Sequence, residues 1–143
     1  MYVGSGIGFL RDDVADLAYR MTPAVTLGYY VIKNDEMSLS FEAGPGYTFE
    51  EVGGLADDFF SLVAAEKFTW ELSDRVTFKQ SLGATLDPFD TANFTLVGDV
   101  FLDIDLTNNL AWRVAAGWTF DHEPAAGRGK DDTTLTTGIS VKF

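Results

Sequence analysis

The chain has 143 residues, enough for a single domain, and its formal net charge of −12 argues against nucleic-acid binding, which depends on clustered Lys and Arg. The absence of cysteine excludes a disulfide scaffold and a thiolate metal site. Apolar residues make up 46% of the sequence, yet no run approaches the ~18–20 residues of a membrane-spanning helix. The chain does not begin with a charged segment followed by an apolar one, as a signal peptide does, so we expect that any signal peptide is absent from it.

Apolar and polar residues alternate with a period of two through most of the chain. In the stretch 37–50, for example, Phe41 and Tyr47 fall on one side and Glu42 and Thr48 on the other. This alternation indicates extended strands between an apolar and a polar environment. It predicts eight strands, at residues 2–10, 24–32, 37–50, 59–72, 76–86, 93–106, 110–121 and 133–143.

The connections between these strands alternate in length. Short turns are predicted at 33–35, 73–75 and 107–109, and longer loops at 11–22, 51–57, 87–92 and 122–132. An even strand number, short turns on one side and long loops on the other are typical of outer-membrane barrels, whose strands need ~9–11 residues to cross. The sequence therefore predicts an all-β domain over residues 1–143, an eight-stranded antiparallel up-and-down transmembrane β-barrel. Because Pro45 cannot donate to a ladder, we expect a bulge or sharp bend at residues 44–46.

The composition of the two strand faces indicates which one is enclosed. The polar face holds many Gly, Thr and Ser together with charges of both signs, which suits a narrow, filled lumen. The other face carries Phe, Trp, Leu and Tyr, and eight strands enclose too little volume for those rings. Trp70 and Trp112 lie near short turns and Tyr47 and Trp118 near long loops, the two heights of aromatic girdles. The alternative is a soluble lipocalin-like ligand-binding barrel, in which the apolar face points inward.

The C-terminal strand adds a more specific pattern. Thr136, Gly138, Val141 and Phe143 match the polar-x-Gly-x-x-apolar-x-apolar ending of outer-membrane barrels, which resembles the signal read by the barrel-insertion machinery.

Three further stretches resemble the YdiY-like salt-induced outer-membrane proteins, a bacterial family of unassigned function. These stretches are residues 41–47, the turn at 70–74, and the segment from Glu123-Pro124 to Leu135. The resemblance runs from about Tyr2 to the C-terminus and implies a bacterial outer-membrane location. Because members usually carry further N-terminal strands, the chain is similar to a C-terminal eight-strand portion. The family gives no catalytic residue, cofactor or metal ligand to carry over.

Two strand pairings place charged residues together. Pairing across the turn at 107–109 sets Asp103 opposite Arg113 and predicts an ion pair on the polar face. Pairing across the turn at 73–75 aligns Leu72 with Val76, Trp70 with Phe78, Phe68 with Gln80 and Glu66 with Leu82.

Glu66 is then a polar break in the apolar face, roughly 15 Å from the turn at ~3.3 Å per residue and a 40° tilt. A bulge between Ala64 and Lys67, a hydrogen bond from a protonated Glu66 to Gln80, or coverage by another chain would relieve its cost.

No residue is expected to be catalytic. His122 is the single histidine and is interpreted as a solvated loop residue, and the acidic loops are interpreted as a solvated rim without the spacing of a calcium-binding hand. We expect an outer-membrane barrel with a structural or interaction role, displayed loops, a filled lumen and no cofactor. Its expected partners are outer-membrane lipid and the insertion machinery, and a homo-oligomer is an open alternative. An outer-membrane lipid-modifying enzyme is the less favoured alternative.

Overall fold

The computed structural model describes residues 1–12, 17–122, 124 and 129–141, except for the side chain of Asp12. Its regular elements are eight β-strands. They are β1 (Tyr2–Asp12), β2 (Leu17–Lys33), β3 (Met37–Val52), β4 (Leu55–Ser73), β5 (Val76–Leu86), β6 (Phe94–Asp105), β7 (Leu110–Asp121) and β8 (Asp131–Val141). Within the described ranges there is no helix of the length and apolarity that crossing a membrane requires.

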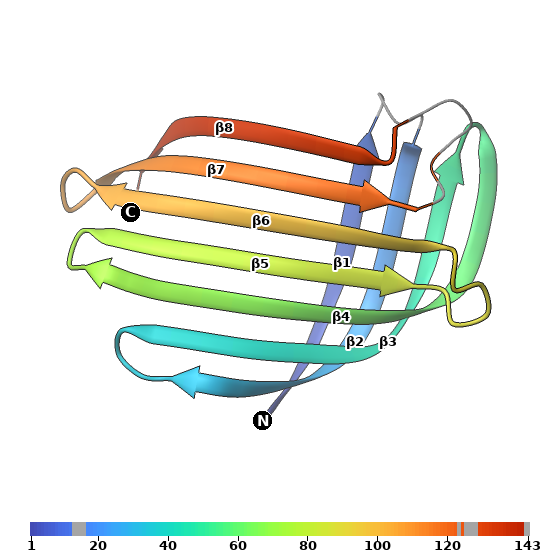
Figure 1. The fold of residues 1–143 in the computed structure, drawn as a ribbon, viewed down its shortest axis with the longest axis horizontal. Coiled ribbons are helices and arrows are strands. Elements are labelled where there is room, and N and C mark those ends of the chain that lie inside the picture. The colour runs from blue at the N-terminus through green and yellow to red at the C-terminus, as the bar shows by residue number, and fades with distance from the viewer. Residues whose placement is uncertain (13–16, 123, 125–128, 142–143) are drawn as a thin grey trace.

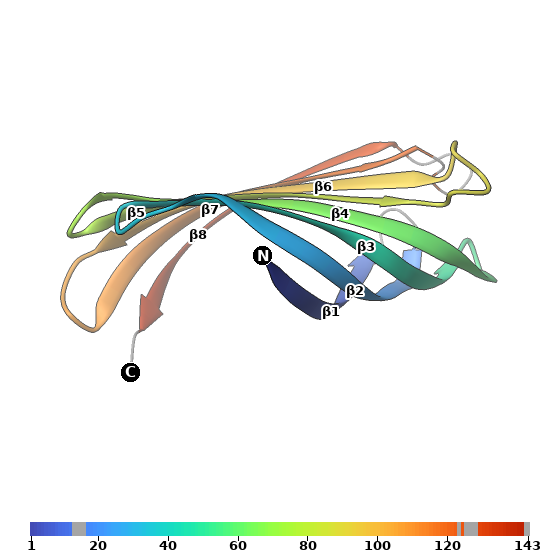
Figure 2. The ribbon, with the colours of Figure 1, turned by 90° about the horizontal axis from the view of Figure 1, so that it is seen from below.

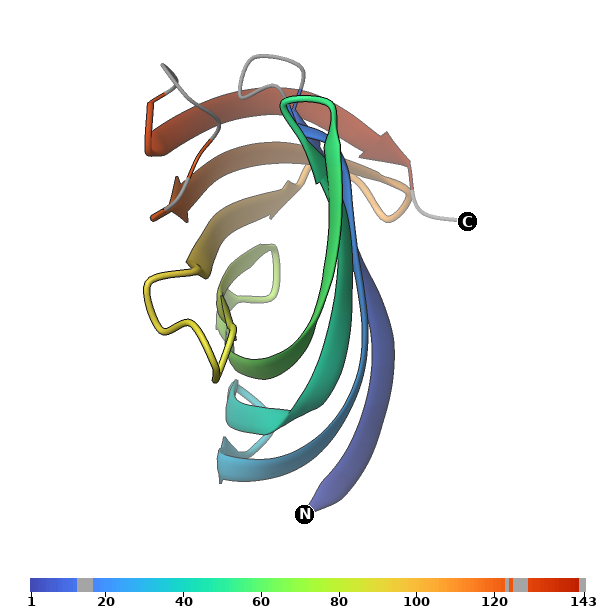
Figure 3. The ribbon, with the colours of Figure 1, turned by 90° about the vertical axis from the view of Figure 1, so that its right-hand side faces the viewer.

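The strands form one antiparallel sheet in sequence order, β1 to β8 (Figure 1). The predicted all-β, eight-stranded, up-and-down topology is therefore confirmed. The sheet is open, because β1 pairs with β2 and β8 with β7, and no pairing joins β1 to β8. The expected closed barrel is not observed. Closure requires strand number, tilt and stagger to match. Here the N-terminal end of β1 and the C-terminal end of β8 lie apart (Figures 1 and 3).

The open sheet is strongly curled. Figure 2 shows it arched over its hollow side, and in Figure 3 β1–β3 form one wall and β5–β7 the opposite wall. At one end the two edges come closer, since Leu10 and Arg11 of β1 and Thr134 and Thr136 of β8 line a common cavity of about 520 Å³.

The enclosed face of this curl is the polar one. Along β3, exposure alternates: Ser40, Thr48 and Glu50 are buried, whereas Phe41 and Tyr47 are exposed. Over the described residues, ten polar or charged side chains are buried and only two apolar ones, Leu17 and Ala111. The prediction that the apolar side faces outward is confirmed for this sheet. We use "enclosed face" for the side of Ser40, Thr48 and Glu50, and "outer face" for the side of Phe41 and Tyr47.

Several predicted strand boundaries are wrong around β2, β3 and β4. The segment 17–22, expected in a loop, belongs to β2, which also carries register shifts between Leu17 and Tyr19 and between Tyr30 and Ile32. The expected loop at 51–57 is instead a two-residue turn between Val52 and Leu55. Gly53 and Gly54 have φ values of 59° and 77°, which a two-residue hairpin turn needs and glycine adopts at little cost. Extended pairing thus continues through Asp57 and Asp58, whose charge had suggested a loop.

Of the two alternatives predicted at residues 44–46, a bulge or a sharp bend, the bulge is wrong. Pro45 pairs with Leu62 within an unbroken register from Met37 to Val52 on the β4 side. The β2 side shows no shift there, and a Cβ on Gly44 would lie 2.0 Å from the carbonyl oxygen of Val25. The backbones of β2 and β3 therefore approach closely where β2–β4 bend (Figure 1). Glycine, rather than a bulge, accommodates this part of the curl.

Candidate functional site

The most enclosed charge is Arg20, on the enclosed face of β2. Its side chain is 8% exposed and binds Glu50 of β3, Asp121 of β7 at 3.0 Å, and the hydroxyl of Thr95 on β6. These contacts connect two opposite walls of the curled sheet. A buried guanidinium with carboxylate partners is a strong, geometrically specific link. Arg20 with Glu50, Thr95 and Asp121 is called the Arg20 clamp below.

Sequence reasoning missed this clamp. Arg20 fell in a predicted loop, and its partners lie 30, 75 and 101 positions further along the chain, as their numbers show. The available signal was the alternation of Arg20, Thr22 and Ala24 with Tyr19, Met21 and Pro23, which continues the polar face of β2 upstream of the proline.

A chain of hydroxyl groups lies next to the clamp. Thr48 is fully buried, shares a 3.0 Å hydrogen bond with Thr22 and donates to Ser61 at 3.1 Å. These contacts join β2, β3 and β4 without charge. They satisfy hydroxyl groups that would otherwise be costly to bury.

A second charged group centres on Glu42 of β3. Lys67 donates to Glu42 Oε1 at 2.6 Å, while Tyr2 and Thr26 donate to Oε2 at 3.2 and 3.4 Å. The Glu42 carboxylate therefore neutralises Lys67 and ties four consecutive strands together. A cavity of about 400 Å³ lies beside it, lined by Gly4, Gly6 and Gly8 among others.

The predicted ion pair between Asp103 and Arg113 is confirmed. The two residues are directly opposite in the β6–β7 register, and Arg113 donates from Nε and Nη2 to the two carboxylate oxygens at 2.6 and 2.8 Å. Lys79 of β5 lies 3.5 Å from Asp103 Oδ2, and the Arg113 guanidinium covers the ring of Phe101 at 5.6 Å. The carboxylate thus holds two cations on the enclosed face.

The polar break in the outer face is confirmed as well. Glu66 pairs with Leu82, and Gln80 donates from Nε2 to Glu66 Oε2 at 3.0 Å. The register is continuous from Ala64 to Lys67, so a bulge does not turn Glu66 inward. The expected pairing of Leu72 with Val76 is wrong, because a register shift after Glu71 pairs Ser73 with Val76.

The two residues singled out near the C-terminus have different outcomes. Gly138 lies opposite Arg113 on β8, and a Cβ there would meet nothing within 4 Å. Packing therefore does not require glycine at this position. Phe143 lies outside the described residues, and the proposal that it takes part in recognition stays a prediction.

His122 is less solvated than expected. Its ring stacks on Phe94 with centroids 4.9 Å apart and planes at 15°, and lies 6.2 Å from the ring of Phe120. Its backbone N–H donates to the carbonyl of Phe94. The imidazole therefore closes an aromatic cluster at the end of β6 and β7. Across the described part of the chain, no three His, Asp or Glu side chains are grouped as a metal site would need.

Taken together, the enclosed face is a set of paired charges and hydroxyls. It ties neighbouring strands to one another and, through Arg20, ties the two walls across the interior. This chemistry stabilises a curled sheet with a polar inside.

A family model described as "Protein of unknown function, DUF481" matches residues 1–143. No curated protein and no solved structure matches the chain.

Proposed function

Because the chain belongs to the DUF481 family, the YdiY-like outer-membrane family expected from its sequence, we propose that it forms a β-barrel of the bacterial outer membrane. In this proposal the outer face contacts lipid, the lumen is filled rather than a wide pore, and the connections opposite the short turns are displayed outside. The role is structural or interactive rather than enzymatic.

The observation that carries the proposal is the inverted burial of the sheet. Large apolar side chains are exposed on every strand of the outer face, among them Ile7, Leu27, Phe41, Leu62 and Ile139. The enclosed side holds buried Arg20, Glu50 and Asp103. Water would disfavour such an exposed apolar band, whereas hydrocarbon favours it. A lipocalin-like binding protein needs the opposite arrangement, with an apolar interior.

The aromatic side chains support this orientation. Trp70 and Trp112 are 40% and 42% exposed near the short-turn end, and Trp118 is 37% exposed towards the other end. Trp112 donates from its indole nitrogen to Thr137 at 2.8 Å, and Trp118 to Asp131 at 3.3 Å. An indole with an apolar body and a satisfied N–H suits a membrane interface.

The lengths of three strands support the proposal that one end of the sheet extends beyond the membrane. A crossing strand needs ~9–11 residues, whereas β2, β3 and β4 have 17, 16 and 19. Measured from their short turns, these strands extend beyond the hydrocarbon as a paired ribbon that ends at Gly53-Gly54. The Tyr47 hydroxyl donates to Asp58 within that ribbon. We propose that this ribbon is the surface that contacts an interaction partner.

Membrane insertion also requires that β1 and β8 be paired, because unpaired N–H and C=O groups are not tolerated in hydrocarbon. Both strands are suited to pairing, since residues 2–10 and 133–141 contain no charged residue and no proline to protect an edge. We propose that the C-terminal strand is also the segment recognised by the insertion machinery.

Tryptophan fluorescence tests the proposal directly, since the three tryptophans all lie on the outer face. The protein is folded in vesicles of a phosphatidylcholine carrying bromine at different acyl depths. We expect strong quenching of each single-tryptophan variant, in which the other two are replaced by Phe. Emission insensitive to the brominated lipid, with the protein remaining soluble without detergent, would overturn the proposal and favour the soluble alternative.

A further inference from the structure

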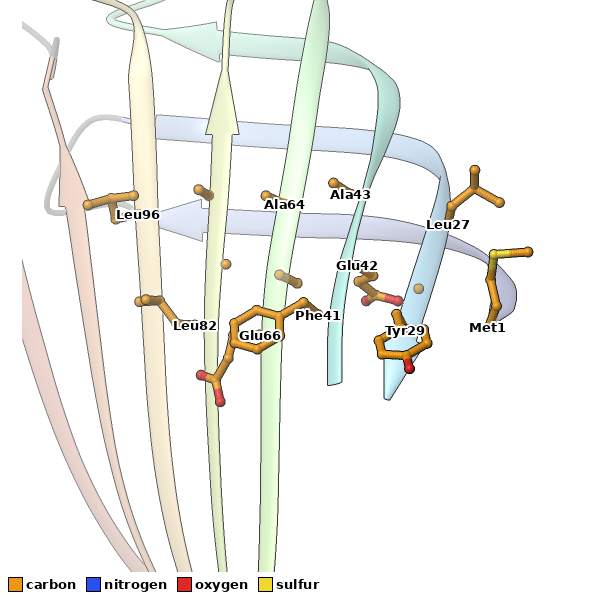
Figure 4. Close-up of a pocket in the computed structure, with 14 residues that line it drawn as sticks. Met1, Leu27, Tyr29, Phe41, Glu42, Ala43, Ala64, Glu66, Leu82 and Leu96 are labelled. Atoms are coloured by element: carbon orange, nitrogen blue, oxygen red, sulfur yellow. The ribbon is translucent and has the colours of Figure 1, made fainter. Parts of the chain in front are cut away.

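A groove of about 580 Å³ crosses the outer face over β2–β6. Its floor is the row Ala43, Ala64 and Ala84, which are direct partners in the sheet, and Leu27 and Leu96 close its two ends. Figure 4 shows Leu27, Ala43, Ala64 and Leu96 in one line, with Phe41, Glu66 and Leu82 forming the next. The groove is thus a shallow depression with a carboxylate on its rim.

The polar pair on this rim, Glu66 and Gln80, uses only part of its hydrogen-bonding capacity. Gln80 uses one N–H on Glu66 Oε2. Within the described residues, the second N–H of Gln80 and Oε1 of Glu66 have no hydrogen-bond partner. The Gln80 side chain has two N–H donors and one acceptor oxygen, and the Glu66 carboxylate has two acceptor oxygens, so among the described residues the pair leaves one N–H donor and two acceptor oxygens unpaired. In hydrocarbon, groups left in this state are costly.

We propose that this groove is the contact surface for a second copy of the chain. A two-fold axis through the groove sets each Glu66–Gln80 pair against its counterpart, so that the free N–H of each Gln80 donates to the free oxygen of the other copy's Glu66. Isologous contacts of this kind are self-complementary by symmetry. The alanine floor lets two sheets approach, as small residues do at membrane interfaces. A lipid acyl chain would fill the depression but satisfy neither polar atom.

The contact area between the two copies determines how stable the dimer is. Taken with one further row of side chains on each side of the groove, from the row of Pro45 to the row of Gln80, the contact measures about 20 Å along the strands, and from β2 to β6 it spans four strand spacings, about 19 Å. That gives about 400 Å² per copy, below the ~800 Å² per partner of a typical stable complex. The dimer is therefore weak and concentration-dependent.

The inference rests on the proposed membrane location and is tested in detergent micelles by sedimentation velocity over a range of protein-to-detergent ratios. The parent should show a monomer–dimer equilibrium. Glu66→Leu and Gln80→Leu should each weaken dimerisation about tenfold, because each removes both hydrogen bonds across the two-fold. Ala64→Phe should abolish it by filling the groove while the polar pair remains. Glu71→Leu is the matched control, since Glu71 lies on the opposite face of the same strand, and it should dimerise like the parent.

Two outcomes would overturn the inference: a parent that is monomeric at every ratio, or Glu66→Leu and Ala64→Phe variants that dimerise like the parent. Quenching by brominated lipid, measured on the same preparations, separates this failure from that of the proposed function. A quenched monomer refutes the dimer alone, whereas an unquenched protein refutes the membrane location.

Discussion

Replacing Arg20 by methionine is the most informative test of the enclosed face. The change keeps most of the side-chain volume but removes the guanidinium from two carboxylates that are themselves enclosed, Glu50 at 9% and Asp121 at 20% side-chain exposure. Breaking a buried pair by removing one partner costs about 3–5 kcal/mol, because the remaining charges are left uncompensated. That loss is a large share of the ~5–15 kcal/mol that stabilises a typical domain.

The assay is urea unfolding of the micelle-folded protein, followed by tryptophan fluorescence, with the free energy of unfolding obtained by linear extrapolation. The double variant Arg20→Met with Glu50→Gln is the internal control. It replaces the uncompensated carboxylate of Glu50 by a neutral amide and should recover about 1–2 kcal/mol of the lost free energy of unfolding. If Arg20→Met costs less than about 1 kcal/mol with an unchanged spectrum, Glu50 and Asp121 are solvated and the clamp does not hold the two walls together.

Three other outcomes follow from the same geometry. Arg113→Met should lower the free energy of unfolding by about 1–2 kcal/mol, less than Arg20→Met does, because the Arg113 side chain is 44% exposed. Urea unfolding equal to that of the parent would show that the ion pair with Asp103 does not stabilise the sheet. Gly44→Ala should destabilise by about 1–3 kcal/mol or more, because its Cβ would overlap the Val25 carbonyl, whereas Gly138→Ala has open space and should unfold like the parent or slightly later. Deleting residues 141–143 from a chain fused to an export signal should abolish surface insertion in cells and only weaken folding in detergent. Normal surface labelling of that deletion would contradict recognition of the C-terminal strand.

Short-range features of this chain were predictable from sequence because they depend on local geometry. A period of two assigns each residue of β3 to one face, and the balance of rings against small polar residues identified which face is enclosed. The Asp103–Arg113 pair followed from the short turn at 107–109, since turn length fixes the register of a hairpin. The Glu66–Gln80 contact also followed from the neighbouring hairpin, although a register shift after Glu71 changes the pairing next to its turn.

Two errors had local signals that went unused. The pair Gly53-Gly54 is a common two-residue hairpin turn, but the surrounding acidic residues suggested a loop. The upstream half of β2 follows an acidic stretch with Asp12, Asp13 and Asp16, which suggested a loop, although the alternation continues on both sides of Pro23.

Other features were decided only by the tertiary structure. The Arg20 clamp joins β2 to β6 and β7, and no local rule brings together residues so far apart in the chain. The same holds for the separation of β1 and β8, which depends on the twist and bend accumulated over eight strands. Alternation and turn length determined the strands, their order and their apolar side, because these are properties of neighbouring residues. How far the sheet curls, and which charges meet across its interior, is a property of the whole sheet.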